Sequence, residues 1–168
     1  CALDIIGAEY VREINPGEVL IVSGHTVSST YPLLQRPKKF CVFEQIYFSR
    51  PDSVYDGEVV YEVRKRIGIE LAKESAVETD IVIPVPDSGV PSALGYAQEA
   101  GIPFEMGITR SHYRGRTFIQ PEQKIRDLGV KLKHNALRSM KGKTVTVIDD
   151  SIVRGTTAKK IIKMLNKV

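Results

Sequence analysis

The sequence has few cysteines and no long hydrophobic run, and both shortages narrow the class of protein that it encodes. Its 168 residues contain two cysteines, Cys1 and Cys41, which are too few for a disulfide framework and favour a reducing, cytoplasmic setting. No apolar stretch approaches the ~20 residues that a membrane-spanning helix needs, and no signal-peptide pattern opens the chain. We therefore expect a soluble, cytoplasmic protein without a membrane partner.

Repeats and low-complexity tracts are also lacking, and the length is typical of one domain. The net charge is only +4, yet residues 101–143 alone hold ten Lys or Arg against three acids. This local excess favours an anionic ligand such as a polyphosphate. Nucleic acid is the rival partner, but no recognition helix, zinc finger or RNA-binding motif accompanies the charge, so we expect no nucleic-acid binding.

The chain is organised around the stretch Val145–Thr157, which reads VTVIDDSIVRGTT. Its apolar, β-branched beginning, Val145–Ile148, predicts a buried strand. The carboxylates of Asp149 and Asp150 follow, and beyond a short loop the apolar residues after Thr156 recur at the spacing of a helix. The predicted buried face of this helix consists of Ala158, Ile161, Ile162 and Leu165.

The polar residues at the end of this strand predict a binding site, because ligands of open α/β sheets bind at the carboxyl ends of the strands. Backbone N–H groups, hydroxyls and a helix N-terminus can hold a phosphate. The two carboxylates can hold ribose hydroxyls or Mg²⁺. A purely structural alternative is that the acids end a strand and that Thr156 caps the helix.

A second strand–loop–helix unit precedes the first. Ile81–Val85 predicts a buried strand, the loop Pro86–Gly89 offers N–H groups to a second phosphate or is an ordinary turn, and a helix follows that ends at Gly101. The segment 58–75 predicts an amphipathic helix with Val59, Val63, Ile67, Leu71 and Ala72 on one face.

Further strands and loops complete the predicted pattern. Phe104–Thr109 predicts a third strand, and a short helix at 122–127 and a strand at 130–133 are expected after it. Residues 110–121 combine glycine, three arginines and aromatics, which indicates either a mobile cover over an anionic ligand or a solvated basic loop. Strands that alternate with helices predict an α/β fold with a mostly parallel sheet flanked by helices.

The first forty residues lack the alternation of strands and helices that the rest of the sequence predicts. Residues 1–23 predict a short helix, a turn at Pro16 and Gly17, and a strand Val19–Val22, while residues 24–39 read as an irregular linker. The following run 40–48 is aromatic and β-prone. A nucleophilic role for Cys1 would require a large domain behind it, so we expect instead that Cys1 marks a point inside a longer protein.

Four blocks of sequence carry a resemblance to a known family. They are FEQIYFSRPDS (43–53), ESAVETDIVIPVPDSGVPSALGYAQEAGIPFE (74–105), YRGRTFIQPEQKIRDLGVKLK (113–133) and VIDDSIVRGTT (147–157). The last resembles the phosphoribosyl-pyrophosphate (PRPP) motif of type I phosphoribosyltransferases. The third resembles the amidophosphoribosyltransferase family in particular, and the likeness covers essentially the whole chain.

This resemblance implies a type I phosphoribosyltransferase fold, truncated at its C-terminus because no strand follows the helix that begins near Thr156. It also implies three segments: the tail of a glutaminase-type domain at 1–23, a linker at 24–39 and the phosphoribosyltransferase domain at 40–168. The implied activity is the glutamine-dependent synthesis of 5-phosphoribosylamine from PRPP in de novo purine biosynthesis. A nucleobase-salvage phosphoribosyltransferase and a non-catalytic PRPP-binding regulator remain the alternatives.

The resemblance also implies roles for individual residues. The implied catalytic residues, in and after the loop that closes over PRPP, are Tyr113, Arg116, Thr117 and Lys131. The implied substrate-binding residues are Asp87, Ser88, Gly89, Asp149, Asp150, Ser151, Arg154, Gly155, Thr156 and Thr157, and Asp149 and Asp150 would also hold Mg²⁺. Many members carry a serine with a metal contact at the position of Gly89, and the glycine here lacks that contact.

Partners and cofactors follow by the same resemblance. They are PRPP, ammonia from a glutaminase domain, purine nucleotides as feedback inhibitors, and further copies of the chain in a homo-oligomer. Cys41 matches one ligand of the [4Fe-4S] cluster that some members carry, although a buried structural thiol is the favoured interpretation.

Overall fold

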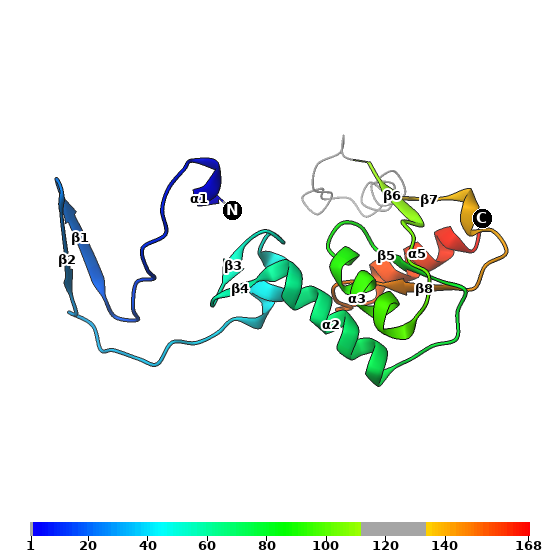
Figure 1. The fold of residues 1–168 in the computed structure, drawn as a ribbon, viewed down its shortest axis with the longest axis horizontal. Coiled ribbons are helices and arrows are strands. Elements are labelled where there is room, and N and C mark those ends of the chain that lie inside the picture. The colour runs from blue at the N-terminus through cyan, green and yellow to red at the C-terminus, as the bar shows by residue number, and fades with distance from the viewer. Residues whose placement is uncertain (1, 112–133) are drawn as a thin grey trace. The chain divides into compact units, whose positions relative to one another are not determined.

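The computed structural model describes residues 2–111 and 134–168 and divides into two compact units, Cys1–Phe43 and Glu44–Val168 (Figure 1). The predicted helix at 122–127 and strand at 130–133 lie outside the described residues. None of the described helices combines the length and the apolar character that crossing a bilayer requires. The three predicted segments 1–23, 24–39 and 40–168 stay a prediction.

The first unit is built around a two-stranded hairpin. After the short helix α1 (Ala2–Ile5), strand β1 (Val19–Ser23) pairs antiparallel with β2 (Thr26–Thr30), and the connecting Gly24 has a φ of 58°. The predicted strand at Val19–Val22 is thus confirmed. The expectation that residues 24–39 are irregular is wrong for β2, because the left-handed glycine turns the chain back along β1.

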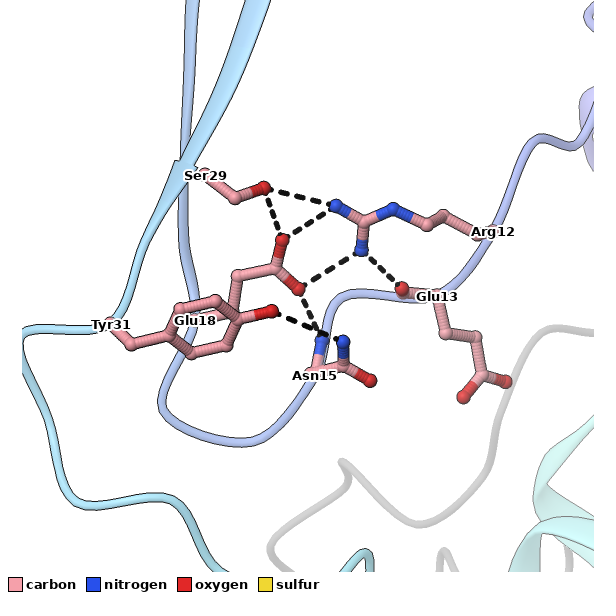
Figure 2. Close-up of polar contacts among 6 residues, drawn as sticks. All are labelled: Arg12, Glu13, Asn15, Glu18, Ser29 and Tyr31. Carbon is pink, nitrogen blue, oxygen red and sulfur yellow. Dashed lines mark hydrogen bonds and ion pairs between the residues drawn. The ribbon is translucent and has the colours of Figure 1, made fainter.

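A buried carboxylate ties this hairpin to the segment before it, as Figure 2 shows. The side chain of Glu18 is fully covered and accepts hydrogen bonds from Arg12 Nη1 at 2.9 Å, from the Asn15 N–H at 2.7 Å and from the Ser29 hydroxyl. These donors, Arg12 first, lower the pKa of Glu18 to about 2. The Glu18 cluster, defined as Arg12, Asn15, Glu18 and Ser29, therefore needs an ionised carboxylate.

We expect acid to open the Glu18 cluster. The folded-state pKa of Glu18 lies below the ~4.3 of an unfolded glutamate, so its stabilisation is complete above that value and is lost as the pH falls toward about 2. Hydrogen-exchange protection factors in β1 and β2 should decrease over that pH window. Glu18→Gln should remove the pH response, whereas Glu9→Gln, at an exposed site in the same unit, should preserve it. Constant protection down to pH 2 would contradict this role.

The second unit has a parallel strand pair at its centre. β5 (Ile81–Pro84) runs beside β8 (Val145–Ile148), with Ile81 opposite Val145 and Pro84 opposite Ile148. A parallel bridge from Val82 to Phe104 adds a further segment to the pair. Both strands were predicted and are confirmed; β5 is buried throughout, while in β8 only Ile148 is fully buried.

Helices cover both faces of this pair (Figure 1). On one face, α3 (Val90–Ala100) packs over Val82 and Ile148, and α2 (Val60–Glu74) packs on α3. On the other face, α5 (Thr156–Leu165) contributes Ile161 to a cluster with Ile81 and Ile83. Consecutive strand residues point to opposite faces. β5 therefore contributes Val82 to the core under α3 and Ile81 and Ile83 to the core under α5. The predicted α/β layering is confirmed.

The contact between α2 and α3 depends on two glycines. A Cβ at Gly68 would lie 1.9 Å from the Ser92 carbonyl oxygen, and one at Gly95 would lie 2.0 Å from that of Lys65. The backbones therefore touch directly, and this close approach decides which face of α2 is buried. The predicted apolar face is wrong in part: Val63 and Ala72 are buried, but Val59, Ile67 and Leu71 are exposed.

Short elements complete the second unit. They are the π-helical turn η1 (Glu44–Phe48), β3 (Val54–Tyr55), β4 (Glu58–Val59), β6 (Ile108–Arg110), β7 (His134–Ala136) and the 3₁₀ turn η3 (Arg138–Met140). β3 pairs with β4 and β6 with β7, both antiparallel. The β-prone run 40–48 forms a helical turn instead of a strand, because η1 packs on α2. The third predicted strand is shorter, since only Phe104 and then Ile108–Arg110 make sheet contacts.

Candidate functional site

A cavity of about 620 Å³ opens at the carboxyl ends of β5 and β8. This is the edge where an α/β sheet binds its ligand. Its lining consists of Tyr47, Ser49, Pro51, Arg64, Val85, Pro86, Asp87, Ser88, Arg110, His134 and Asp149–Ala158. The tertiary structure thus brings the two predicted strand–loop–helix units to one place.

The carboxylates after β8 are half-buried and adjacent. The Asp150 N–H donates to Asp149 Oδ1 at 2.9 Å, and the Ser151 hydroxyl donates to Asp150 Oδ1 at 3.0 Å. Burial, with a smaller contribution from the charge of Asp150, raises the pKa of Asp149 to about 6, although the hydrogen bond from the Asp150 N–H opposes it. Each carboxylate has one oxygen for which the structure shows no partner among the described residues. A cation or hydroxyl ligand would relieve this arrangement.

The loop that follows turns into the N-terminus of α5 at Gly155. Gly155 adopts a φ of 67°, a left-handed conformation that other residues adopt only with strain. Thr156 and Thr157 occupy the first turn of α5, which is ten residues long. Unpaired N–H groups and the helix dipole make that turn suitable for an anion. The expected helix is confirmed, but Ile162 from its predicted buried face is 52% exposed.

The loop after β5 approaches the same edge. Val85 donates its N–H to the Ile148 carbonyl at 2.8 Å, and Gly89 donates to the Val85 carbonyl at 3.0 Å. A Cβ at Gly89 would lie 2.7 Å from the Ile148 carbonyl oxygen, so a larger residue here would require the loop backbone to shift. Asp87 and Ser88 line the cavity, whereas Gly89 supports the loop from behind.

A basic side chain reaches this loop from β6. Arg110 forms an ion pair with Asp87 across 23 residues of sequence. Its Nε is buried without a hydrogen-bond partner among the described residues. The pair brings the guanidinium of Arg110 to the cavity lining, and a cation at this place suits a ligand with several anionic groups.

The structure also shows lining residues to which the sequence assigned no role. Tyr47, Ser49 and Pro51 come from η1 and the turn after it, and Arg64 comes from α2. The block 43–53 was noted only as part of a resemblance. Arg64 lies in the predicted amphipathic helix but outside its predicted apolar face, and no pattern in the sequence marks a buried arginine.

Other predicted residues are not placed at the cavity. Tyr113, Arg116, Thr117 and Lys131 lie outside the described residues. Cys41 belongs to the first unit and is exposed. The interpretation of Cys41 as a buried thiol is therefore wrong, because the extended segment around it buries little. No cluster of three or more metal-ligating side chains occurs in residues 2–111 and 134–168.

Comparison with known families agrees with this geometry. The phosphoribosyl transferase domain family matches residues 52–168, and the chain belongs to that family. The chain is also similar to amidophosphoribosyltransferases: it is 55% identical to that of Rhizobium etli and 49% identical to that of Bacillus subtilis, in each case over 99% of this chain and 35% of the relative. The chloroplastic protein of Glycine max is 57% identical over 99% of this chain and 30% of its own length.

Solved structures give the same result. The structure of an allosteric regulatory enzyme of purine biosynthesis matches with a TM-score of 0.87 and 49% identity, over 99% of this chain and 36% of that one. The glutamine PRPP amidotransferase of B. subtilis, complexed with ADP and GMP, matches equally well over 37% of its chain. The predicted type I phosphoribosyltransferase fold is confirmed. The chain spans about a third of the length of these relatives.

Proposed function

We propose that this chain supplies the phosphoribosyltransferase site of a glutamine-dependent amidophosphoribosyltransferase of purine biosynthesis. The main support is the cavity itself, where two adjacent carboxylates, a hydroxyl-bearing loop and a helix N-terminus converge. The chain is 49–55% identical to amidophosphoribosyltransferases over 99% of its length. This identity favours the proposed activity over nucleobase salvage and over a non-catalytic regulator.

The proposed ligand is PRPP, and each part of it has matching groups in the cavity. Ser151 to Thr157 would hold the 5-phosphate at the N-terminus of α5. Asp149 and Asp150 would accept hydrogen bonds from the ribose hydroxyls. Asp87 and Ser88 would lie beside the pyrophosphate group. By resemblance, Tyr113, Arg116, Thr117 and Lys131 complete the site.

The carboxylates also fit Mg²⁺, because this ion binds through one or two carboxylates and the phosphates of its substrate. Asp149 and Asp150 would hold it through the oxygens that make no hydrogen bond to described residues. Bound there, Mg²⁺ would neutralise charge on the pyrophosphate. The residues of the chain show no such fit for an iron–sulfur cluster: Cys41 is exposed, and no second cysteine lies among residues 2–111 and 134–168.

The proposed reaction breaks the bond between C1 of the ribose and pyrophosphate and forms a C1–N bond to ammonia. Positive charge develops at C1, as in glycoside cleavage, and the carboxylates beside the ribose suit that charge. Pyrophosphate takes the bonding electron pair, and ammonia loses one proton as phosphoribosylamine forms. In the intact enzyme, hydrolysis of glutamine to glutamate would supply the ammonia. A cytoplasmic location, purine-nucleotide inhibition and a homo-oligomer are further proposals.

The proposal is tested by incubating the protein with PRPP and Mg²⁺ and with ammonium, glutamine or a purine base in parallel. We expect pyrophosphate release that depends on ammonium, or on glutamine in the full-length protein. Release that depends only on the purine base would show a salvage enzyme. PRPP binding without turnover of any acceptor would show a regulator.

A further inference from the structure

One buried charge in the second unit is explained neither by the core nor by an ion pair. Arg64 lies on α2 and is only 3% exposed. It forms no ion pair with a carboxylate among the residues that the structure describes. Burial lowers the pKa of Arg64, and the nearby charge of Asp150 opposes this shift. Burying an unpaired cation costs free energy unless its donors are satisfied.

The donors of Arg64 are directed at the turn η1. Nε donates to the Gln45 carbonyl at 2.7 Å, and Nη2 donates to the Ser49 carbonyl at 2.8 Å. The rigid fork of a guanidinium suits two fixed acceptors better than the single flexible ammonium of a lysine would. The two bonds hold the beginning and the end of the turn that carries Tyr47.

The held turn forms part of the cavity. Tyr47, Ser49 and Pro51, which we call the η1 wall, line it together with Arg64 itself. All three residues precede position 52, where the match to the family begins, whereas both substrate loops lie inside the match. The η1 wall therefore comes from a segment that precedes those loops in the chain, and it needs a connection to the layer that carries them.

Arg64 provides this connection from a rigid position. The Ser92 hydroxyl of α3 donates to the Arg64 carbonyl at 3.1 Å. One turn further along α2, Gly68 allows the closest contact between α2 and α3. The backbone of Arg64 is thus fixed to the layer that packs on β5 and β8, while its side chain fixes the η1 wall.

We propose that Arg64 is a positioning residue for the substrate cavity, which holds the η1 wall at the place where the wall contacts PRPP. The inference rests on the proposed PRPP site. Without the guanidinium, two carbonyls lose their partners and the wall shifts relative to the substrate loops. The effect on the ligand passes through Tyr47 rather than through a direct contact of Arg64 with PRPP.

A double-mutant cycle in the chain tests this inference. Affinity for PRPP–Mg²⁺ is measured by calorimetry for wild type, Arg64→Met, Tyr47→Ala and the double variant. Loss of hydrogen bonds to a charged group predicts a decrease of about tenfold or more for Arg64→Met. Because Arg64 acts through the wall, Arg64→Met should weaken binding little further once Tyr47 is gone.

Arg66→Met is the matched control, because Arg66 lies on the same helix but is exposed and pairs with Glu58. It should bind PRPP–Mg²⁺ like wild type. If Arg64→Met does not fold, Arg64→Lys replaces it: this variant keeps the charge but cannot serve both carbonyls, and intermediate affinity is expected. Wild-type affinity in the Arg64 variant would overturn the inference. So would a double variant whose fold-loss of affinity equals the product of the two single fold-losses, because the two residues would then act independently. No PRPP binding by wild type would instead overturn the proposed function.

Discussion

Asp150→Asn should lower turnover of PRPP by at least ~10²-fold, the loss that follows removal of one strong transition-state contact. The carboxylate of Asp150 lies next to that of Asp149 in the cavity lining. Burial, with a smaller contribution from the charge of Asp150, raises the pKa of Asp149 to about 6, so the fold gains little from these charges without a ligand. Thermal stability should therefore stay unchanged or rise slightly. The measurement is steady-state pyrophosphate release with PRPP, Mg²⁺ and ammonium, together with a melting curve.

Asp80→Asn is the control for this prediction. Asp80 precedes the amino end of β5, away from the cavity lining, and its carboxylate accepts the Thr144 N–H at 2.7 Å. That bond joins the starts of β5 and β8, and the amide oxygen of Asn can still accept it. Both the melting temperature and turnover should therefore change little in Asp80→Asn. If Asp150→Asn melted early and turned over normally, Asp150 would have a structural role instead.

Gly95→Ala should destabilise the second unit by about 2–3 kcal/mol, which is a typical cost of overpacking a core. The new Cβ would lie 2.0 Å from the Lys65 carbonyl oxygen, and this oxygen belongs to the backbone of α2, so neither helix can yield locally. The helices must separate, which loosens the contacts around Ala93 and Tyr96. A decrease of several degrees in melting temperature is expected.

Helix propensity alone would predict that Gly95→Ala stabilises the protein by about 1 kcal/mol, whereas the contact with α2 predicts destabilisation. Gln98→Ala is the matched control, because Gln98 is exposed on the same helix and its replacement should change stability by less than about 0.5 kcal/mol. A Gly95→Ala protein more stable than wild type would show that α2 and α3 do not touch at this position.

Local patterns in the sequence were sufficient for the elements that carry the site. β5, β8 and the start of α5 were predictable because short β-branched runs end in polar loops, and because Gly155 and the threonines after it mark a helix start. The position of Asp149 and Asp150 at the end of β8 was predictable for the same reason, and their assignment to a ligand stays a prediction. These features depend only on residues close together in the chain.

Tertiary packing decided the rest. The buried face of α2 contains Arg64 and Gly68, whereas Ile67 and Leu71 are exposed. Backbone contact with α3 at Gly68 outweighs the apolar pattern of the helix. Residues 44–48 of the β-prone run became a helical turn because α2 offers them a packing surface and a guanidinium. The bonds of Arg64 to η1 and the pairing of Arg110 with Asp87 join residues distant in sequence, so only the folded chain defines them.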